Sequence, residues 1–286
     1  MKNLIIGAFA VLGSPLLVGN ALAAEDETPS RRSELNETLA ASVNNLGLQN
    51  VLELSWRRPL SASRNPLLSG AHTAFGVSHT LTPSYTRVGA WAELSPLSVL
   101  DLRVGVEPTA YFGTFHSLMS FDSYGDSFTN DARDQRGGGG FGTAGRVYLS
   151  PTLKMKAGPV VAMASADFEW WKSDAQGPLF YEPARDTLLK ASGDQLLNTS
   201  SVLLYQFELG PRGQLAAGLI HQMTYVYAAP ANKIQRLGLL AVRQFGAKRF
   251  GLSHPRLLAT VAYYLDDPSK RHTVSAAVAL GFKSTR

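Results

Sequence analysis

The sequence contains no cysteine, so no disulfide bond can stabilise the folded chain. It also lacks an uninterrupted apolar run of the roughly 18 or more residues that a membrane-spanning helix needs. The longest run begins at Leu4 and is broken by Gly13, Ser14 and Pro15. These absences exclude a disulfide-stapled secreted domain and a helical membrane protein. Two sources of stability remain for the folded chain: a large hydrophobic core or a closed β-barrel. A closed barrel is possible in a membrane because it satisfies every backbone polar group within lipid.

Charged residues are scarce, at 17% of the chain, and they are scattered. The formal net charge of +5 is therefore not concentrated in a basic patch, and nucleic acid is excluded as a partner. With no cysteine and six histidines, the sequence predicts neither a metal site nor a cofactor. The glycine run Gly137–Gly140 is not followed by Lys-Ser or Lys-Thr, so it is not a phosphate-binding loop.

The chain begins with the features of an export signal. Lys2 precedes the apolar run from Leu4, and the small residues Ala21 and Ala23 stand ahead of acidic Glu25. This order predicts a signal peptide over residues 1–23 that is cleaved near Ala23. An uncleaved membrane anchor is the alternative, which the interruptions in the apolar run disfavour.

Alternation of apolar with small or polar residues dominates the rest of the chain. In the last strand, Val274, Val278 and Phe282 fall on one face, since successive side chains of a strand point to opposite sides. Similar segments predict an all-β, antiparallel, up-and-down transmembrane barrel. We expect ten strands, at 46–57, 72–94, 100–107, 146–156, 160–171, 203–209, 214–227, 234–246, 257–265 and 272–282, with a bulge near His221. Eight or twelve strands are alternatives, twelve if residues 72–82 cross separately.

The strand pattern divides the chain into a signal peptide, a polar periplasmic segment at 24–45 and a barrel at 46–286. In the polar segment, Leu35, Leu39 and Val43 line one face of a short helix or belong to a disordered tail. An even strand number places both ends of the barrel on the periplasmic side. We therefore expect the loop after 46–57 and the two large loops, 114–140 and about 174–197, outside the cell.

Aromatic residues near strand ends, among them Trp56, Trp91, Tyr111, Trp170, Trp171 and Tyr227, suggest the two girdles of a membrane barrel. With the signal peptide, the alternation and the last strand ending at Phe282, the chain resembles Gram-negative outer-membrane β-barrel proteins over residues 46–283. The resemblance implies an outer-membrane location, contact with outer-membrane lipid, and insertion by the barrel-assembly machinery. That machinery reads a terminal aromatic residue, which four further residues follow here. A secreted, soluble β-sandwich binding protein is the alternative.

The polar faces of the strands carry charges of both signs, which can pair across neighbouring strands in a lumen. The lumen-facing candidates are Glu53, Arg57, Asp101, Arg103, Glu107, Arg146, Lys154, Asp167, Glu169 and Arg236. They predict a non-enzymatic barrel with either a narrow, porin-like passage for small solutes or a structural role with ligand-binding loops.

An outer-membrane hydrolase is the alternative function. Outer-membrane proteases, which this chain resembles in strand number, use Asp and His residues at the barrel mouth. Candidates at that position are His72, His79, His116, Asp122, Asp126, Asp131 and Asp134. No fixed spacing marks a catalytic pair, so we assign no catalytic residue. A lipase-like hydrolase is the other form of this alternative, since outer-membrane phospholipases carry a His-x-Ser pair on a strand. Here His116 and Ser117 are adjacent, so on a strand they would point to opposite faces.

Overall fold

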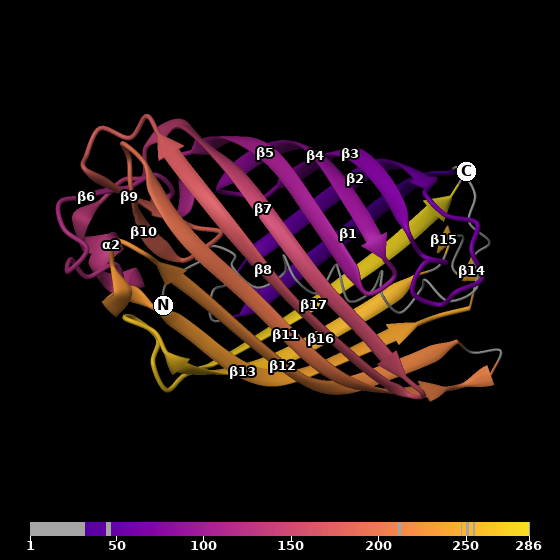
Figure 1. Ribbon diagram of the computed structural model, residues 1–286. Helices are drawn as coiled ribbons and strands as arrows, with labels where there is room; N and C mark the ends of the chain where they lie inside the picture. Colours follow the sequence, from indigo (N-terminus) through magenta and orange to yellow (C-terminus); the bar gives the residue numbers. More distant parts are fainter. Residues whose placement is uncertain are drawn as a thin grey trace.

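The computed structural model describes residues 32–43, 47–210, 213–246, 248–249, 252–253 and 255–285, and twelve antiparallel strands close into a barrel (Figure 1). Leu39 of the first strand stands opposite Leu280 of the last, which closes the ring. The predicted signal peptide, its cleavage near Ala23 and residues 24–31 lie outside the described residues. In chain order, the barrel strands are β1 (Arg32–Val43), β2 (Gly47–Pro59), β3 (His72–Leu81), β4 (Tyr85–Leu97), β5 (Leu100–Phe112), β7 (Phe141–Ala157), β8 (Val160–Ser173), β11 (Asp194–Glu208), β12 (Gln214–Val226), β13 (Ile234–Gln244), β16 (Arg256–Asp266) and β17 (Val274–Thr285).

The prediction of ten strands is wrong by two; twelve was one of the two alternatives, beside eight. Segment 72–94 contains two strands, β3 and β4, because Thr82, Pro83 and Ser84 form a turn in its middle. Residues 32–43, predicted to lie outside the barrel, form β1 instead. Its inward positions are polar apart from Ala40, and this strand pairs with β2 and β17.

Strand number decides which connections share an end of the barrel. The long connections 113–140 and 174–193 lie at one end, which we call the loop end. Arg32, Thr285 and residues 60–71 lie at the other, the terminal end. The expectation that the loop after 46–57 joins the two large loops is therefore wrong. Segment 72–94 contains two strands, so three strands, and not two, separate that loop from residues 113–140.

The barrel exterior is apolar. Outward side chains that are strongly exposed include Val104, Leu153, Leu203, Leu239 and Val261, at 50, 56, 51, 64 and 53%. Exposed aromatic residues lie near both ends: Trp56, Phe75, Tyr205 and Phe207 toward the terminal end, and Phe141, Trp170, Tyr227 and Tyr263 toward the loop end. An apolar belt between two aromatic girdles is the surface of a barrel that faces lipid. Within the described residues, no helix is long and apolar enough for a membrane crossing.

Some of the predicted details are corrected by the pairing. Trp91, Tyr111 and Trp171 do not join the girdles; they point inward and are 7, 2 and 2% exposed. The register of β12 with both neighbours is continuous, so the bulge expected near His221 is absent from these pairings. Register shifts occur instead between Leu94 and Leu97 and at Gln235.

The two long connections at the loop end fold together as a cap. Residues 113–140 contain the short 3-10 helix η1 (Thr114–His116), the short strand β6 (Ser120–Phe121) and helix α2 (Asn130–Arg136). Residues 174–193 contain β9 (Leu179–Glu182) and β10 (Thr187–Lys190), and β6, β9 and β10 form one small sheet. Figure 1 shows this sheet and α2 gathered at the end of the barrel opposite β14 (Lys248–Arg249) and β15 (Leu252–Ser253).

The barrel interior has two unlike sides. Strands β2 to β8 present most of the inward charges, whereas β11 to β16 present a cluster of buried apolar side chains that includes Val202, Leu204, Ile220, Leu240 and Leu258. Because the outward neighbours of these residues are also apolar, this part of the wall lacks the alternation of polarity seen in β5 and β7.

Candidate functional site

A β-hairpin of the cap, formed by β9, β10 and the tip Pro183–Asp186, is buried in the mouth of the barrel. Phe180, Tyr181, Leu188 and Leu189 are each fully buried. Packing against the barrel wall and against Phe121 and Phe128 of the other connection explains why a segment this apolar is not a solvent-exposed loop.

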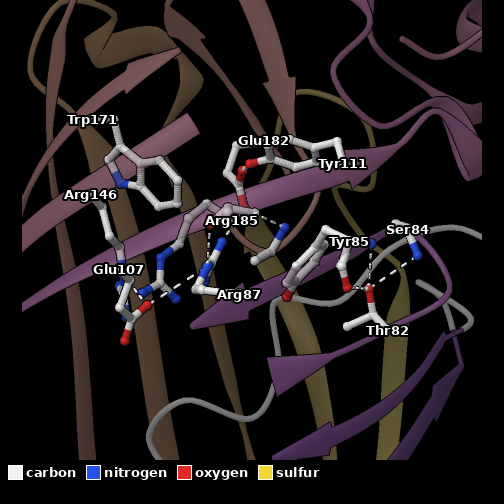
Figure 2. Close-up of polar contacts among 12 residues, drawn as sticks. Thr82, Ser84, Tyr85, Arg87, Glu107, Tyr111, Arg146, Trp171, Glu182 and Arg185 are labelled. Carbon is white, nitrogen blue, oxygen red and sulfur yellow. Dashed lines mark hydrogen bonds and ion pairs between the residues drawn. The ribbon is translucent and has the colours of Figure 1, made fainter. Parts of the chain in front are cut away.

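The first charge of the hairpin tip, Glu182, is held by two barrel strands. Its carboxylate accepts a hydrogen bond from the Tyr111 hydroxyl of β5 and lies 3.1 Å from a guanidinium nitrogen of Arg87 on β4. The backbone N–H of Ala184 donates to the same carboxylate at 3.1 Å. Figure 2 shows Glu182 between Tyr111 and the guanidinium groups of Arg87 and Arg185. The Glu182 side chain is fully buried, so these partners replace the water that it loses.

The second charge, Arg185, binds Glu169 on β8. Its Nε donates to Glu169 Oε2 at 3.2 Å, and one terminal nitrogen forms an ion pair with Oε1. Glu169 also pairs with Arg146 of β7 and accepts a hydrogen bond of 2.7 Å from the Trp171 indole N–H. One fully buried carboxylate thus joins the hairpin tip to two barrel strands.

The third charge, Asp186, binds the connection between β16 and β17. Its carboxylate forms an ion pair with Lys270 and accepts a hydrogen bond of 2.6 Å from the Tyr181 hydroxyl. Burial raises the pKa of Tyr181 well above its ordinary value, with the Asp186 charge acting in the same direction. Burial also raises the pKa of Asp267, next to which Asp186 adds a second negative charge. The tip is therefore anchored on opposite parts of the barrel.

Below the hairpin, ion pairs continue along the wall toward the terminal end. Glu107 lies 2.7 Å from Arg146 and 3.7 Å from Arg87. Arg103 bridges Glu93 and Glu53 at 2.9 and 3.2 Å. A separate pair joins Asp101 to Lys154 at 2.6 Å. Alternating signs on neighbouring strands let each buried charge find a partner.

A cavity of about 190 Å³ lies between this wall and the hairpin tip. Ala184 and Arg185 line it from the cap, and strands β1 to β8 supply most of the remaining lining. Inward glycines shape the wall here: the ring of Trp91 lies on Gly76 and the ring of Tyr148 on Gly105. A Cβ atom added to either glycine would stand 2.5 Å from the ring. These two positions require glycine because an aromatic side chain occupies the space of a Cβ.

The structure places the ten lumen-facing candidates as follows. Glu53, Asp101, Arg103, Glu107, Arg146 and Asp167 line the cavity. Lys154 and Glu169 do not line it but pair with residues that do. Arg57 is opposite Arg32 in register near the terminal end. Arg236 is buried on β13, 5.4 Å from the centre of the Tyr264 ring.

The seven His and Asp candidates do not gather at one place. His116 and Asp134 are in contact within the cap at 2.6 Å, and Asp126 instead accepts hydrogen bonds from Arg136 and two backbone N–H groups. His79 binds Thr86 on the barrel wall. Within the described residues, no group of three or more potential metal ligands occurs.

His72 lies at the terminal end, where its Nε2 faces both Glu93 at 3.1 Å and Ser95 at 3.2 Å. In a catalytic relay, the acid and the serine bind opposite ring nitrogens. Here both bind one nitrogen, Nδ1 contacts the Gly70 carbonyl oxygen, and Ser95 donates to Asp101. Ser95 is also 1% exposed, so this cluster has the geometry of a structural network.

Sequence reasoning missed the residues of the hairpin tip, Glu182, Arg185 and Asp186, because they fall in a segment predicted to be an outside loop. A signal was present in the apolar pairs Phe180-Tyr181 and Leu188-Leu189, which are unfavourable in an exposed loop. Arg87 and Glu93, inward on β4, complete the network that these residues contact.

No protein-family model and no curated protein matches the chain in sequence. Among solved structures, it is similar to the β domain of the Bordetella autotransporter BrkA, with 14% identity, 90% of this chain and 99% of that chain covered, and a TM-score of 0.42. It is also similar to the translocator domain of the autotransporter NalP from Neisseria meningitidis, with 10% identity, 94% of this chain and 92% of that chain covered, and a TM-score of 0.44. For OmpT, an outer-membrane protein of Vibrio cholerae, the corresponding values are 7%, 91%, 99% and 0.39. This likeness is one of fold alone. The closed barrel, its apolar belt and its aromatic girdles make the chain an outer-membrane β-barrel protein of the general class that the sequence predicts.

Proposed function

We propose that the protein is a non-enzymatic channel for small polar solutes, closed in this conformation by the hairpin of β9 and β10. The observation that carries the proposal is the position of the hairpin tip, which stands over a polar cavity and is held there by ion pairs. The loop end then faces outward and the terminal end faces the periplasm. A structural barrel would need neither an internal cavity nor ion pairs that hold a loop over it.

Ion pairs are suited to a gate because water can replace each partner when the gate opens. The hairpin belongs to a connection between strands, so it can leave the mouth without breaking a strand pairing of the barrel. Opening exposes Glu182, Arg185 and Asp186 together with their wall partners, and every one of these groups can then be hydrated. A few kcal/mol between the two states is enough for a strong preference for closure.

Conductance in planar bilayers tests the proposal. Because the chain has no cysteine, the double variant Asp186→Cys/Lys270→Cys carries a unique thiol pair, one thiol on the hairpin tip and one on the connection 267–273. A short, reducible bis-thiol cross-linker should abolish conductance, and reduction should restore it in the same bilayer. The single variant Asp186→Cys, treated identically, is the control and should stay conductive.

The channel proposal fails if correctly folded, heat-modifiable protein never conducts, whether the hairpin is tethered, released or deleted. It also fails if tethering leaves the conductance unchanged, since the hairpin is then not the gate.

A hydrolase at the mouth is the second candidate, and the contact between His116 and Asp134 is the observation that favours it. His116 and Asp134 side chains are 20 and 39% exposed, so a substrate can reach them from outside. This candidate predicts peptide or ester hydrolysis that is lost in both His116→Ala and Asp134→Ala. The channel proposal predicts no such activity and unchanged conductance in the two variants.

A further inference from the structure

We infer that the lumen cavity is a binding site for a neutral, polyhydroxylated solute of about the size of a monosaccharide. The inference rests on the proposed channel function and names its substrate class. It is carried by three features of the cavity lining: its charge balance, two buried polar atoms without partners, and the occupied faces of its aromatic rings.

The first feature is that the charges of the lining cancel. Five basic residues oppose five acidic ones, so the lining has no formal net charge: Arg87, Arg103, Arg146, Arg185 and Arg256 against Glu53, Glu93, Asp101, Glu107 and Asp167. The ion pairs described above already use several of these charges against one another. An ionic solute would lose its hydration without finding an unbalanced counter-charge, which is unfavourable in a buried site.

The second feature is that two lining groups are buried without a hydrogen-bond partner. Trp91 is 7% exposed and its indole N–H lacks an acceptor; Asn36 is 8% exposed and its side-chain carbonyl oxygen lacks a donor. Neither atom finds a partner within the described part of the chain. Buried polar groups are rarely left in this state, because an unmade hydrogen bond costs about 1–3 kcal/mol. A hydroxyl group can accept from the first and donate to the second, and a polyol offers several at once.

Around these two atoms, the lining provides further partners for hydroxyl groups. Neutral side chains of β1, β2, β3 and β7 contribute oxygens and an amide: Thr38, Gln49, Ser78, Thr80, Ser150 and Thr152. Ionised carboxylates offer about four acceptor sites each, more than their arginine partners use. The volume of about 190 Å³ holds at least about six water molecules at ~30 Å³ each, which is suited to one sugar ring.

The third feature limits the solute further. The guanidinium carbon of Arg103 lies 3.8 Å from the centre of the Trp91 ring, and that of Arg146 lies 4.7 Å from the centre of the Tyr148 ring. The same rings also lie against Gly76 and Gly105. Aromatic stacking is therefore already used by the protein itself. The third lining ring, that of Tyr85, has the guanidinium carbon of Arg87 4.9 Å from its centre. A nucleobase or an aromatic amino acid would therefore compete with an arginine at each ring, whereas a sugar needs only the polar edges.

Binding is tested on the full-length protein folded in detergent, by calorimetry and by tryptophan fluorescence. The probes are glucose and sorbitol, compared with a hexose phosphate, lysine and a nucleoside. Saturable binding of a neutral probe is expected, with a fluorescence change that disappears in Trp91→Phe. That variant removes the indole N–H together with the part of the indole that lies on Gly76, so a second variant on another strand is needed. The control Trp170→Phe changes a tryptophan on the lipid face and should bind like the wild type.

Asn36→Ala, on a different strand, provides a second readout if Trp91→Phe does not fold. It should weaken binding of the neutral probe by about 3- to 10-fold, which corresponds to one neutral hydrogen bond. Tighter binding of the phosphate, the amino acid or the nucleoside than of glucose or sorbitol would overturn the inference. So would binding of the neutral probes that is unchanged in both variants.

Conductance separates this inference from the channel proposal. A protein that conducts ions but binds no neutral polyol is a channel with a different solute, and only the inference fails. A protein that binds glucose or sorbitol through Trp91 and Asn36 but never conducts supports the site and overturns the channel. Both fail if neither binding nor conductance is observed in heat-modifiable protein.

Discussion

Removal of the Arg185 side chain should release the hairpin while the barrel stays intact. In Arg185→Ala, Glu169 loses the guanidinium of the tip but keeps Arg146 and the Trp171 indole. Loss of one partner from a buried ion pair destabilises a protein by about 3–5 kcal/mol. Because Glu169 keeps a second cation, we use the lower limit, ~3 kcal/mol, for the docked hairpin.

Each 1.4 kcal/mol corresponds to a factor of ten in the ratio of two states. A loss of ~3 kcal/mol lowers the ratio of docked to released hairpin by about 100-fold. Hydrogen exchange follows separation of the hairpin from the other connection of the cap, because the Tyr181 N–H donates to the Met119 carbonyl oxygen of that connection at 3.0 Å. Its exchange rate should rise about 100-fold, with a parallel rise in open probability in planar bilayers.

The control is Arg64→Ala, which removes an exposed arginine on the connection 60–71 at the other end of the barrel. It should change neither quantity. If the amide of Tyr181 exchanges equally slowly in Arg185→Ala and in the wild type, the ion pair with Glu169 does not hold the hairpin and the reasoning is refuted.

Three further outcomes are expected. Above pH ~10, the docked cap should lose stability, because burial raises the pKa of Tyr181 and Tyr124 in the folded state, so the released tyrosines ionise first. The measurement is hydrogen exchange of cap amides between pH 9 and 11, a range that brackets the ordinary tyrosine pKa of ~10. Exchange should accelerate by more than the intrinsic rate increase, and an increase equal to the intrinsic one would contradict the prediction. Leu239→Arg, on the lipid face and 64% exposed, should destabilise the barrel by about 2–4 kcal/mol if it lies at mid-membrane depth, measured by urea unfolding in lipid vesicles against Leu239→Ala; an equal effect of both would contradict a lipid-facing position. Gly105→Val should abolish heat-modifiable folding because its Cβ meets the Tyr148 ring at 2.5 Å, and Tyr148→Ala should restore it; failure of the second change to rescue would assign the defect to the backbone instead.

Alternation of polarity predicted most strands and their faces because the two sides of the wall meet different media. In β5, outward Leu102, Val104 and Val106 separate inward Arg103 and Glu107, as the sequence indicates. The alternation did not predict β1, because its outward residues Leu35, Leu39 and Val43 are four positions apart, with Glu37 and Ala41 between them. That spacing is compatible with one face of a helix as well as with one face of a strand.

Individual charges of the site could be predicted, but their partners could not. The sequence shows Asp101, Arg103 and Glu107 as the polar face of one strand. Their partners depend on the register between strands, and a shift of one residue would turn every side chain of a strand to the other face. The hairpin contacts depend on a segment folding back into the barrel, for example Glu182 reaching Arg87 over 95 positions of the chain. No local pattern encodes a contact of that separation.

The three anchors of the hairpin tip lie on both sides of the seam that closes the barrel. Glu182 and Arg185 bind β4, β5 and β8, which belong to one stretch of the wall. Lys270, the partner of Asp186, follows β16, and the pairing of β1 with β17 lies between β16 and that stretch. A plug held in this way also works as a clasp, because one short hairpin ties together the two sides of the wall that meet at the seam.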